Sequence, residues 1–179
     1  VSSFLADMFA LSKIELNIIF SIDDPLAKNV DLISYNEYFG WYYVTFFTEQ
    51  MMIPEGTLRR LMFEIMPEIK ISSSFDKPIH ISEFGAGAKY GNHTDEIWSE
   101  GYQAKVYAGQ LEMLSRNPQV QGISPWILKD FRAMLRPLPG IQDFYNRKGL
   151  IDENGNRKEA FKILSDFYKN QWDQQIIKN

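Results

Sequence analysis

Three times along this chain, a short apolar segment typical of a β-strand is followed by a segment with helical periodicity. The strand-like segments begin near positions 31, 79 and 120, and helical patterns follow from about positions 54, 99 and 159. Such alternation is typical of parallel strands joined by right-handed crossovers. It predicts an α/β fold, either an open sheet or a barrel, in which loops at the carboxyl ends of the strands carry the functional residues.

The second of these strands ends on a single carboxylate. Ile79 and Ile81 are β-branched residues two positions apart, as in a strand, and Glu83 follows them. Gly85 and Gly87 then allow the chain to leave the sheet sharply. Glu83 is therefore expected at the carboxyl end of a strand, where such folds bind ligands. The alternative for Glu83 is a carboxylate that caps the next turn.

The helical segments are amphipathic and their ends are marked by specific residues. The first is expected to begin at Pro54 and to be kinked or ended by Pro67, with residues 72–74 as the loop to the next strand. Ser99 is expected to cap the second helix through its hydroxyl. The predicted buried stripes are Leu58, Leu61, Met62, Ile65 and Ile69 in the first helix, Tyr102, Val106, Tyr107, Leu111 and Leu114 in the second, and Ala160, Phe161, Leu164, Phe167 and Tyr168 in the last.

The remaining strands deliver aromatic residues to their carboxyl ends. A buried strand over residues 30–35 precedes residues 36–43, whose bulky rings are expected to fit neither a tight turn nor an unbroken strand. A strand over residues 120–127 carries Trp126 at its end. The loop from 129 to 148 is far longer than the usual ~4–6 residues and is expected to be functional. Residues 16–20 form either a short strand or an extended connection.

Composition excludes several classes of function. The net charge is −4 and the pI is near 5.2, so a nucleic-acid partner is not expected. No run of about 18 apolar residues is present, so no membrane-spanning helix is predicted. The chain has two histidines without metal-ligand spacing and no cysteine, and therefore no metal or other cofactor is expected. The aromatic content of 15% suits a site that stacks on sugar rings.

Three or four strand-helix units cannot close a (β/α)₈ barrel. The chain begins at Val1 without a lead-in segment. We therefore expect residues 1–179 to be the C-terminal half of a TIM barrel, a fragment of a longer chain. Such a half-barrel has two unpaired sheet edges, which are expected to favour association with a second copy or with the missing half.

Four motifs in register resemble the catalytic domain of glycoside hydrolase family 2, the group that contains β-glucuronidases and β-galactosidases. The first two are Asn36-Glu37-Tyr38-Phe39-Gly40-Trp41-Tyr42 and Pro78-Ile79-His80-Ile81-Ser82-Glu83-Phe84-Gly85. The others are Trp98-Ser99-Glu100-Gly101-Tyr102-Gln103 and Trp126-Ile127-Leu128-Lys129-Asp130-Phe131-Arg132. The resemblance extends from about Asp23 to Tyr168.

The resemblance implies a retaining β-glycoside hydrolase with Glu83 as its nucleophile. Retention requires a second carboxyl group about 5–5.5 Å away that acts as acid and base. In the family this group is the Glu of an Asn-Glu pair on an earlier strand, in a segment that would precede Val1. Asn36-Glu37 imitates that pair, but it matches the sugar-site loop one strand before the nucleophile, so Glu37 is not expected to be the acid/base. The fragment alone is expected to be inactive.

Several other residues are candidates for sugar binding. Trp126 is expected to form an apolar wall under the sugar, whereas Asn36, Tyr38 and Tyr42 would contact hydroxyl groups or orient Glu83. Packing at the barrel mouth is the alternative for each of them. Asp130 could bind a sugar hydroxyl, or it could pair with the neighbouring Lys129 or Arg132.

The triplet Asn146-Arg147-Lys148 bears on the choice of substrate. It resembles the Asn-x-Lys pair with which β-glucuronidases hold the sugar carboxylate, so a terminal β-glucuronide is the favoured substrate. Asn146 would be a donor and Lys148 a point charge. A basic loop without this role is one alternative. A β-galactosidase or another family 2 hexosidase, and a non-catalytic carbohydrate-binding barrel, are the competing functions.

Overall fold

The computed structural model describes residues 18–42 and 54–178, with side chains up to residue 170. Expectations that fall on residues 1–17 and on Tyr43 lie outside the described residues. Within the described ranges, no helix is long and apolar enough to cross a membrane.

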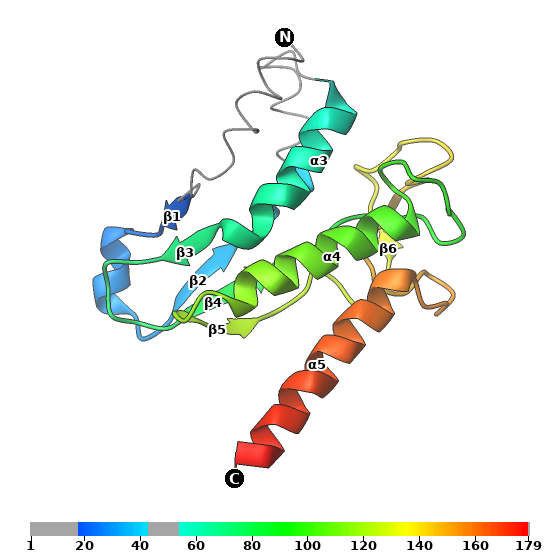
Figure 1. The fold of residues 1–179 in the computed structure, drawn as a ribbon. Coiled ribbons are helices and arrows are strands. Elements are labelled where there is room, and N and C mark those ends of the chain that lie inside the picture. The colour runs from blue at the N-terminus through cyan, green and yellow to red at the C-terminus, as the bar shows by residue number, and fades with distance from the viewer. Residues whose placement is uncertain (1–17, 43–53, 179) are drawn as a thin grey trace.

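The three predicted strands lie side by side in one parallel sheet. Strand β4 is central, with β2 on one side and β5 on the other, and both pairings are parallel. Figure 1 shows the three strands side by side. Ile79 of β4 lies opposite Ile33 of β2 and Val120 of β5. This confirms the predicted parallel α/β arrangement. The bounds are β2 (Ile33–Asn36), β4 (Ile79–Glu83) and β5 (Val120–Ile123).

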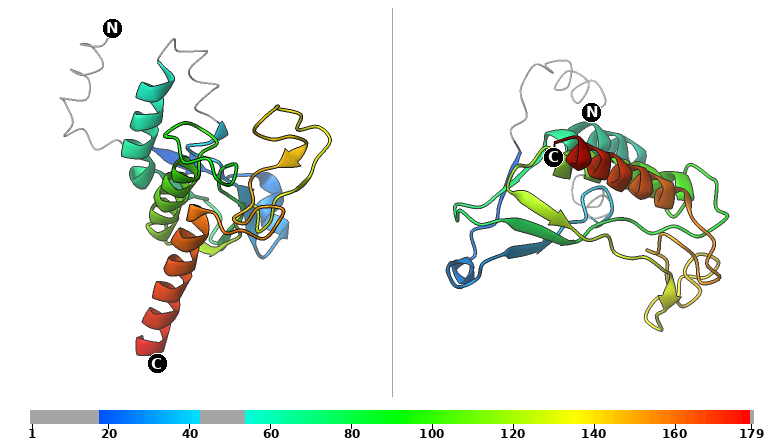
Figure 2. Two further views of the ribbon diagram at one scale, coloured as in Figure 1. Left: turned by 90° about the vertical axis from the view of Figure 1, so that its right-hand side faces the viewer. Right: turned by 90° about the horizontal axis from the view of Figure 1, so that it is seen from below.

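The predicted helices form near the expected positions and lie to one side of the strands (Figure 2). The Ser99 hydroxyl accepts a hydrogen bond of 3.0 Å from the Tyr102 amide, which confirms the predicted cap. Pro67 falls within a short 3₁₀ segment that ends the first helix, because proline offers no amide hydrogen to continue it. The bounds are α3 (Glu55–Ile65), η2 (Met66–Glu68), α4 (Glu100–Ser115) and α5 (Glu159–Lys178).

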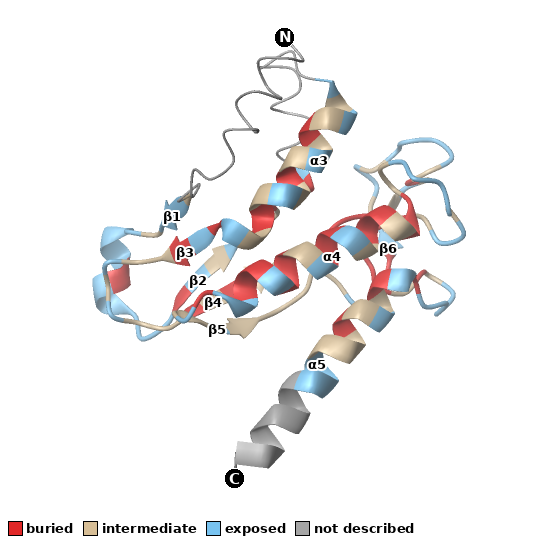
Figure 3. Ribbon diagram, viewed as in Figure 1, coloured by how far each residue is buried: buried red, intermediate tan, exposed pale blue. Residues whose placement is uncertain are grey.

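The core lies between the central strand and α4. Ile79 and Ile81 are fully buried and belong to the same apolar cluster as Tyr107 of α4. Figure 3 shows buried residues both in α4 and in the neighbouring strands. The residues between them face the other way, since side chains alternate along a strand. On that face His80 is only partly buried, and its Nε2 lies 2.9 Å from the Ser124 hydroxyl. The sheet therefore has one apolar face under the helices and one polar face.

Residues 70–72, part of which was expected to be a loop, form a further strand. Strand β3 (Lys70–Ser72) pairs in parallel with β1 (Ile19–Ser21), so the run of serines begins inside a strand. Ile71 is buried, and its amide donates a 2.8 Å hydrogen bond to Oδ1 of Asn117. A short 3₁₀ helix η1 (Pro25–Asn29) follows β1.

The third strand of the sheet is shorter than predicted. β5 ends at Ile123, because Pro125 has no amide hydrogen for a ladder, and Trp126 therefore lies in the connection beyond the strand. The peptide bond between Trp126 and Ile127 is cis. The long loop that follows contains a small antiparallel pair, β6 (Phe131–Arg132) and β7 (Tyr145–Asn146), which closes its two ends on each other.

Candidate active site

The aromatic segment after β2 does form a tight turn, contrary to expectation. The Trp41 amide donates to the carbonyl of Tyr38 over 3.1 Å, and Gly40 takes the positive φ of 80° that this turn requires. A side chain at Gly40 would lie 2.7 Å from Cε of Met66. The bulky rings are accommodated because they leave the turn in different directions. Phe39 enters the main core, whereas Tyr38 and Tyr42 lie edge to face with centroids 4.9 Å apart.

This turn brings a tyrosine onto the carboxylate of Glu83. The Tyr38 hydroxyl donates a 2.7 Å hydrogen bond to Oε2 of Glu83, and the Glu37 amide donates to the Glu83 carbonyl over 2.8 Å. Burial, and then the adjacent carboxylate, raise the pKa of Tyr38, so its hydroxyl stays protonated as a donor. Asn36 is exposed, and its Oδ1 accepts a 2.7 Å bond from the Ser82 hydroxyl. Glu83 is therefore held at the strand end by both its backbone and its side chain.

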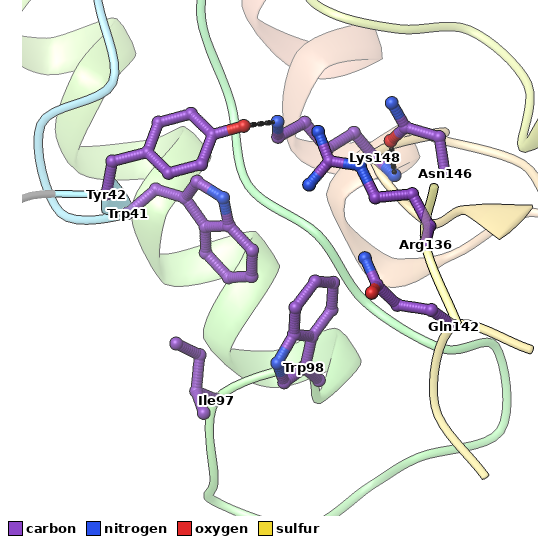
Figure 4. A pocket seen from close by; sticks show the side chains of 8 residues that line it. All are labelled: Trp41, Tyr42, Ile97, Trp98, Arg136, Gln142, Asn146 and Lys148. Atoms are coloured by element: carbon purple, nitrogen blue, oxygen red, sulfur yellow. Dashed lines mark hydrogen bonds between the residues drawn. The ribbon is translucent and has the colours of Figure 1, made fainter. Parts of the chain in front are cut away.

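Lys148 lies across the same tyrosine pair. Its ammonium donates to the Tyr42 hydroxyl and lies 4.3 Å and 4.8 Å from the ring centroids of Tyr42 and Tyr38. Oδ1 of Asn146 accepts a 3.2 Å bond from the Lys148 amide (Figure 4). The NH₂ group of the same side chain remains a potential hydrogen-bond donor in the pocket wall. Lys148 therefore links the triplet to the turn.

A pocket of about 230 Å³ opens between these elements. Trp41 and Trp98 form part of its wall, with ring centroids 4.8 Å apart and planes at 88° (Figure 4). Gly87 makes their packing possible, because a side chain there would lie 2.5 Å from the Trp98 ring. The described residues that line the pocket are Trp41, Tyr42, Ile97, Trp98, Arg136, Gln142, Asn146 and Lys148.

Glu37 points away from this pocket and into the protein. It is 1% exposed. Its Oε1 accepts a hydrogen bond from the Phe39 amide, with Nε2 of Gln110 at 3.5 Å, and its Oε2 has no hydrogen-bond partner among the residues that the structure describes. Burial without a cation raises the pKa of Glu37 to about 8, so this carboxyl is neutral at pH 7. Its contacts support the turn that carries Tyr38 and Tyr42, and they give it no path to a bound sugar.

Asp130 is a buried ion-pair centre, which corrects the expectation for this residue. Its side chain has no exposed surface, and its partners are Arg147 at 3.3 Å and Lys158 at 2.9 Å, not the neighbouring Lys129 or Arg132. The reason is that Lys129 and Arg132 lie at the surface, whereas the buried carboxylate requires cations that are buried with it. With both oxygens already bonded, Asp130 presents none to a sugar hydroxyl.

Lys158 and Gly149 complete this cluster. The Lys158 ammonium also donates to the carbonyls of Ala88 at 2.6 Å and Arg147 at 3.1 Å. The Gly149 amide donates to Oδ1 of Asp130 over 2.8 Å, and a Cβ at Gly149 would lie 2.3 Å from the Asp130 nitrogen. Burial acts to raise the pKa of Asp130 and to lower that of Lys158, and their mutual attraction offsets part of both shifts. The cluster fixes the segment that carries Asn146 and Lys148.

Four of the expected sugar-binding residues are not among those that line the pocket, namely Trp126 and Asn36 as well as Tyr38 and Asp130. Trp126 is partly exposed and packs edge to face on Phe131 at 6.4 Å, and Asn36 contacts Ser82. Glu83 does not line the pocket itself. Its carboxylate is bonded to Tyr38, whose ring contacts the lining residue Tyr42. In the described ranges, no group of three or more histidine or acidic side chains is arranged to hold a metal ion.

Sequence reasoning missed Arg136 and Gln142, which line the pocket from the long loop. A usable signal was present, because both belong to the loop that was expected to be functional and lie within ten residues of Asn146. What the sequence did not indicate is that the β6–β7 pair folds this loop back, so that residues 136 and 142 lie beside Lys148.

Comparisons with curated proteins point to one group. No protein-family model matches the chain. It is 26% identical over 148 residues to a putative β-glucuronidase of Formosa agariphila, covering 83% of this chain and 16% of that protein. It is 30% identical over 147 residues to the β-glucuronidase of Mus musculus, covering 79% of this chain and 21% of that protein. The chain thus spans about a fifth of the length of the curated relatives it matches.

Solved structures give the same picture. A GH2 β-galacturonidase from Eisenbergiella tayi, bound to galacturonate, is 29% identical with a TM-score of 0.58, covering 78% of this chain and 24% of that one. A Ruminococcus gnavus β-glucuronidase, 19% identical with a TM-score of 0.60, covers 85% of this chain and 26% of that one, and shows likeness of fold alone. The described elements therefore form a mixed α/β unit that resembles part of these enzymes.

Proposed function

Because the chain is a segment of a glycoside hydrolase family 2 domain of the glucuronidase type, we propose that it supplies the nucleophile and the sugar-binding wall of a retaining β-glycosidase. The observation that carries this proposal is the placement of Glu83. It sits at the carboxyl end of the central strand, its Oε2 accepts 2.7 Å from the Tyr38 hydroxyl, and Tyr38 in turn adjoins the pocket of Tyr42 and Lys148.

In this mechanism the Glu83 carboxylate attacks the anomeric carbon and forms a covalent glycosyl-enzyme, which water then hydrolyses. Tyr38 holds Oε2, which leaves Oε1 as the attacking oxygen. A second carboxyl group protonates the leaving oxygen and later activates the water. Within the described residues, Glu37 and Asp130 are enclosed and turned away from Glu83's partners. We therefore place the acid/base in a part of the whole protein that precedes this chain, as the family resemblance implies.

We further propose that residues 1–179 belong to the C-terminal half of a (β/α)₈ barrel. Three parallel strands with helices on one side and polar residues on the other support this arrangement. In a closed barrel the polar face looks inward, and the outer edges of β2 and β5 pair with the remaining strands. An isolated half would instead expose those edges and associate with a second copy, which size-exclusion chromatography of the isolated chain would detect.

The proposed substrate is a terminal β-uronide. Lys148 supplies a cation and Asn146 a free NH₂ group on one wall of the pocket, and both are groups that bind a carboxylate. Tyr42 positions the lysine. Trp126 and Asn36, which lie outside the pocket wall, are proposed to contact other parts of the bound sugar. The β-galacturonidase among the similar structures leaves two uronides, glucuronide and galacturonide, as equal candidates.

The nucleophile is tested by paired substitutions in the complete protein. Glu83→Gln should nearly abolish turnover, whereas Glu37→Gln, an equal change on a carboxyl that faces the core, should leave a substantial fraction. Added azide should not increase product formation by the Glu37→Gln variant. Equal losses at both positions, each rescued by azide, would overturn the assignment and make Glu37 a participant in the chemistry.

The substrate is tested by comparing nitrophenyl glucuronide, galacturonide and galactoside with the complete protein. Preference for either uronide supports the role of Lys148 and Asn146, and Lys148→Met should remove that preference. Clear preference for the galactoside would contradict the proposal that the substrate is a uronide. Binding of uronic acids without turnover of any glycoside would instead favour a non-catalytic carbohydrate-binding barrel, a candidate motivated by the single active-site carboxylate among the described residues.

A further inference from the structure

The described residues that line the pocket carry positive charge and include no acidic side chain. Two of its described lining residues, Arg136 and Lys148, are cations, and none of the others is acidic. This is unusual in a chain with a net charge of −4. The pocket of about 230 Å³ is smaller than the ~300–1,000 Å³ of typical drug-sized ligand sites, so it suits a single ring or a small group.

Arg136 is the less explained of the two cations. The other arginines of the same loop have partners, since Arg132 lies 5.3 Å from the Tyr145 ring centroid and Arg147 binds Asp130 and Glu153. The guanidinium of Arg136 has no hydrogen bond or ion pair with any part of the chain that the structure describes. It is also half-buried, so it has lost part of its hydration without gaining a counter-charge.

The backbone holds this arginine in place. The Arg136 amide donates to the carbonyl of Ala133 over 3.0 Å, and its carbonyl accepts from the Phe144 amide over 2.8 Å. Across the same loop, the Lys89 ammonium donates to the Gly140 carbonyl over 2.6 Å. The side chain therefore projects from an ordered turn toward the space that Asn146 and Lys148 face (Figure 4). A preorganised guanidinium of this kind matches the two oxygens of an oxyanion.

We propose that Arg136 determines specificity at this site by binding, together with Lys148, an oxyanion carried by the substrate. This inference rests on the proposed glycosidase function. The oxyanion has two sources. It is either the carboxylate of the uronic acid ring, shared between Arg136, Lys148 and Asn146, or an acidic group on the leaving part of the glycoside, which would occupy Arg136 while the ring carboxylate occupies Lys148.

The test measures binding separately from turnover in the complete protein. Trp41 and Trp98 line the pocket, so their fluorescence reports its occupancy. Wild type, Arg136→Gln and Arg136→Lys are titrated with glucuronate, galacturonate and glucose. Arg132→Gln is the matched control, because it removes an arginine of the same loop that lies on a tyrosine ring outside the pocket wall. Turnover is then compared for phenyl and 4-carboxyphenyl glycosides, each as glucuronide and glucoside.

If the ring carboxylate is the ligand, Arg136→Gln weakens glucuronate or galacturonate binding about ten- to a hundred-fold, while glucose binding and Arg132→Gln stay within about two-fold of wild type. If an acidic leaving group is the ligand, Arg136→Gln instead removes a preference for 4-carboxyphenyl over phenyl glycosides. Arg136→Lys should retain part of either effect. The proposal is overturned if Arg136→Gln changes charged and neutral ligands equally, or changes neither. Absence of turnover in wild type with intact anion binding would reject the glycosidase function alone.

Discussion

Glu37 and Asp130 are both buried acids beside the same site, and they are accommodated in opposite ways. Within the described part of the chain, Glu37 has a backbone amide and a glutamine as neighbours, no cation, and one oxygen without a partner. Asp130 has two cations and a glycine amide on its oxygens. Glu37 is accommodated as a neutral acid, because burial raises its pKa to about 8. Asp130 is accommodated as an anion, because Arg147 and Lys158 compensate its charge.

The difference assigns distinct roles to the two sides of the site. The Glu37 region supports the turn that carries Tyr38 and Tyr42, and its stability depends on a proton. The Asp130 region supports the loop segment that carries Asn146 and Lys148, and its stability depends on keeping a set of charges complete. Each of the following experiments acts on one side and compares it with the other.

Removing the lysine from the Asp130 cluster should have the largest effect. Lys158→Met takes away one of the two cations of the cluster together with four hydrogen bonds, at a cost of about 4 kcal/mol in the free energy of unfolding. Urea denaturation of the complete protein measures this. A loss below about 1 kcal/mol would mean that Arg147 alone compensates Asp130, and the contrast with Glu37 would disappear.

The Glu37 region should respond to pH. The folded-state pKa of Glu37 is about 8 and its ordinary value is 4.5, so the folded state retains a proton that the unfolded state releases. The stability that this group contributes is therefore fully present below pH 4.5 and is lost as pH rises to about 8, at up to about 1.4 kcal/mol per pH unit. Glu37→Gln mimics the neutral acid and should remove this dependence. Parallel stability-pH curves for wild type and Glu37→Gln would contradict the assignment of a neutral buried acid.

The link between the Glu37 turn and the proposed nucleophile should give a smaller effect, on activity and not on folding. Tyr38→Phe removes the hydrogen bond to Oε2 of Glu83 and should lower kcat/KM by about ten- to a hundred-fold, since a bond to a charged group contributes roughly 1.5–3 kcal/mol. Tyr145→Phe removes a hydroxyl from the Asp130 side and serves as the control. Similar kinetics for both variants would argue against a role of Tyr38 in orienting Glu83.

The smallest effect is expected from an ion pair at the surface of α5. Lys162 and Asp166 are paired four residues apart, and the Lys162 side chain is 79% exposed. Lys162→Met should change the free energy of unfolding by less than about 0.5 kcal/mol, because water screens such pairs. Since Lys158→Met makes the same chemical change four residues earlier on the chain, the ratio of the two losses measures what burial adds.

Much of the framework could be predicted because it depends on local pattern. The alternating Ile79 and Ile81, the serine at the start of α4 and the stripe along that helix each determine a local structure directly. Glu83 could be placed at the carboxyl end of its strand for the same reason. The site lies at this edge because parallel strands bring their carboxyl ends together.

The rest depended on contacts between distant segments. Lys158 is 28 residues from Asp130, and nothing in the sequence selects it over the adjacent Lys129. Arg136 faces Lys148 only because β6 and β7 pair within the long loop. The tight turn at Gly40 was not predicted, because the total volume of the aromatic side chains does not show that each ring packs in a different direction. Pairing partners and ring directions are set by the assembled core, and local pattern does not encode them.

The hydrogen bonds of Lys158 also predict which positions a loss-of-function screen of this protein would recover. One ammonium joins the connection after β4, at Ala88, to Asp130 and Arg147 of the long loop, and it does so from the residue just before α5. A screen for loss of the proposed hydrolysis would therefore recover changes at Lys158 about as readily as changes at Glu83. Only growth at low temperature or added osmolyte would separate them, because Lys158 variants would regain function and Glu83 variants would not.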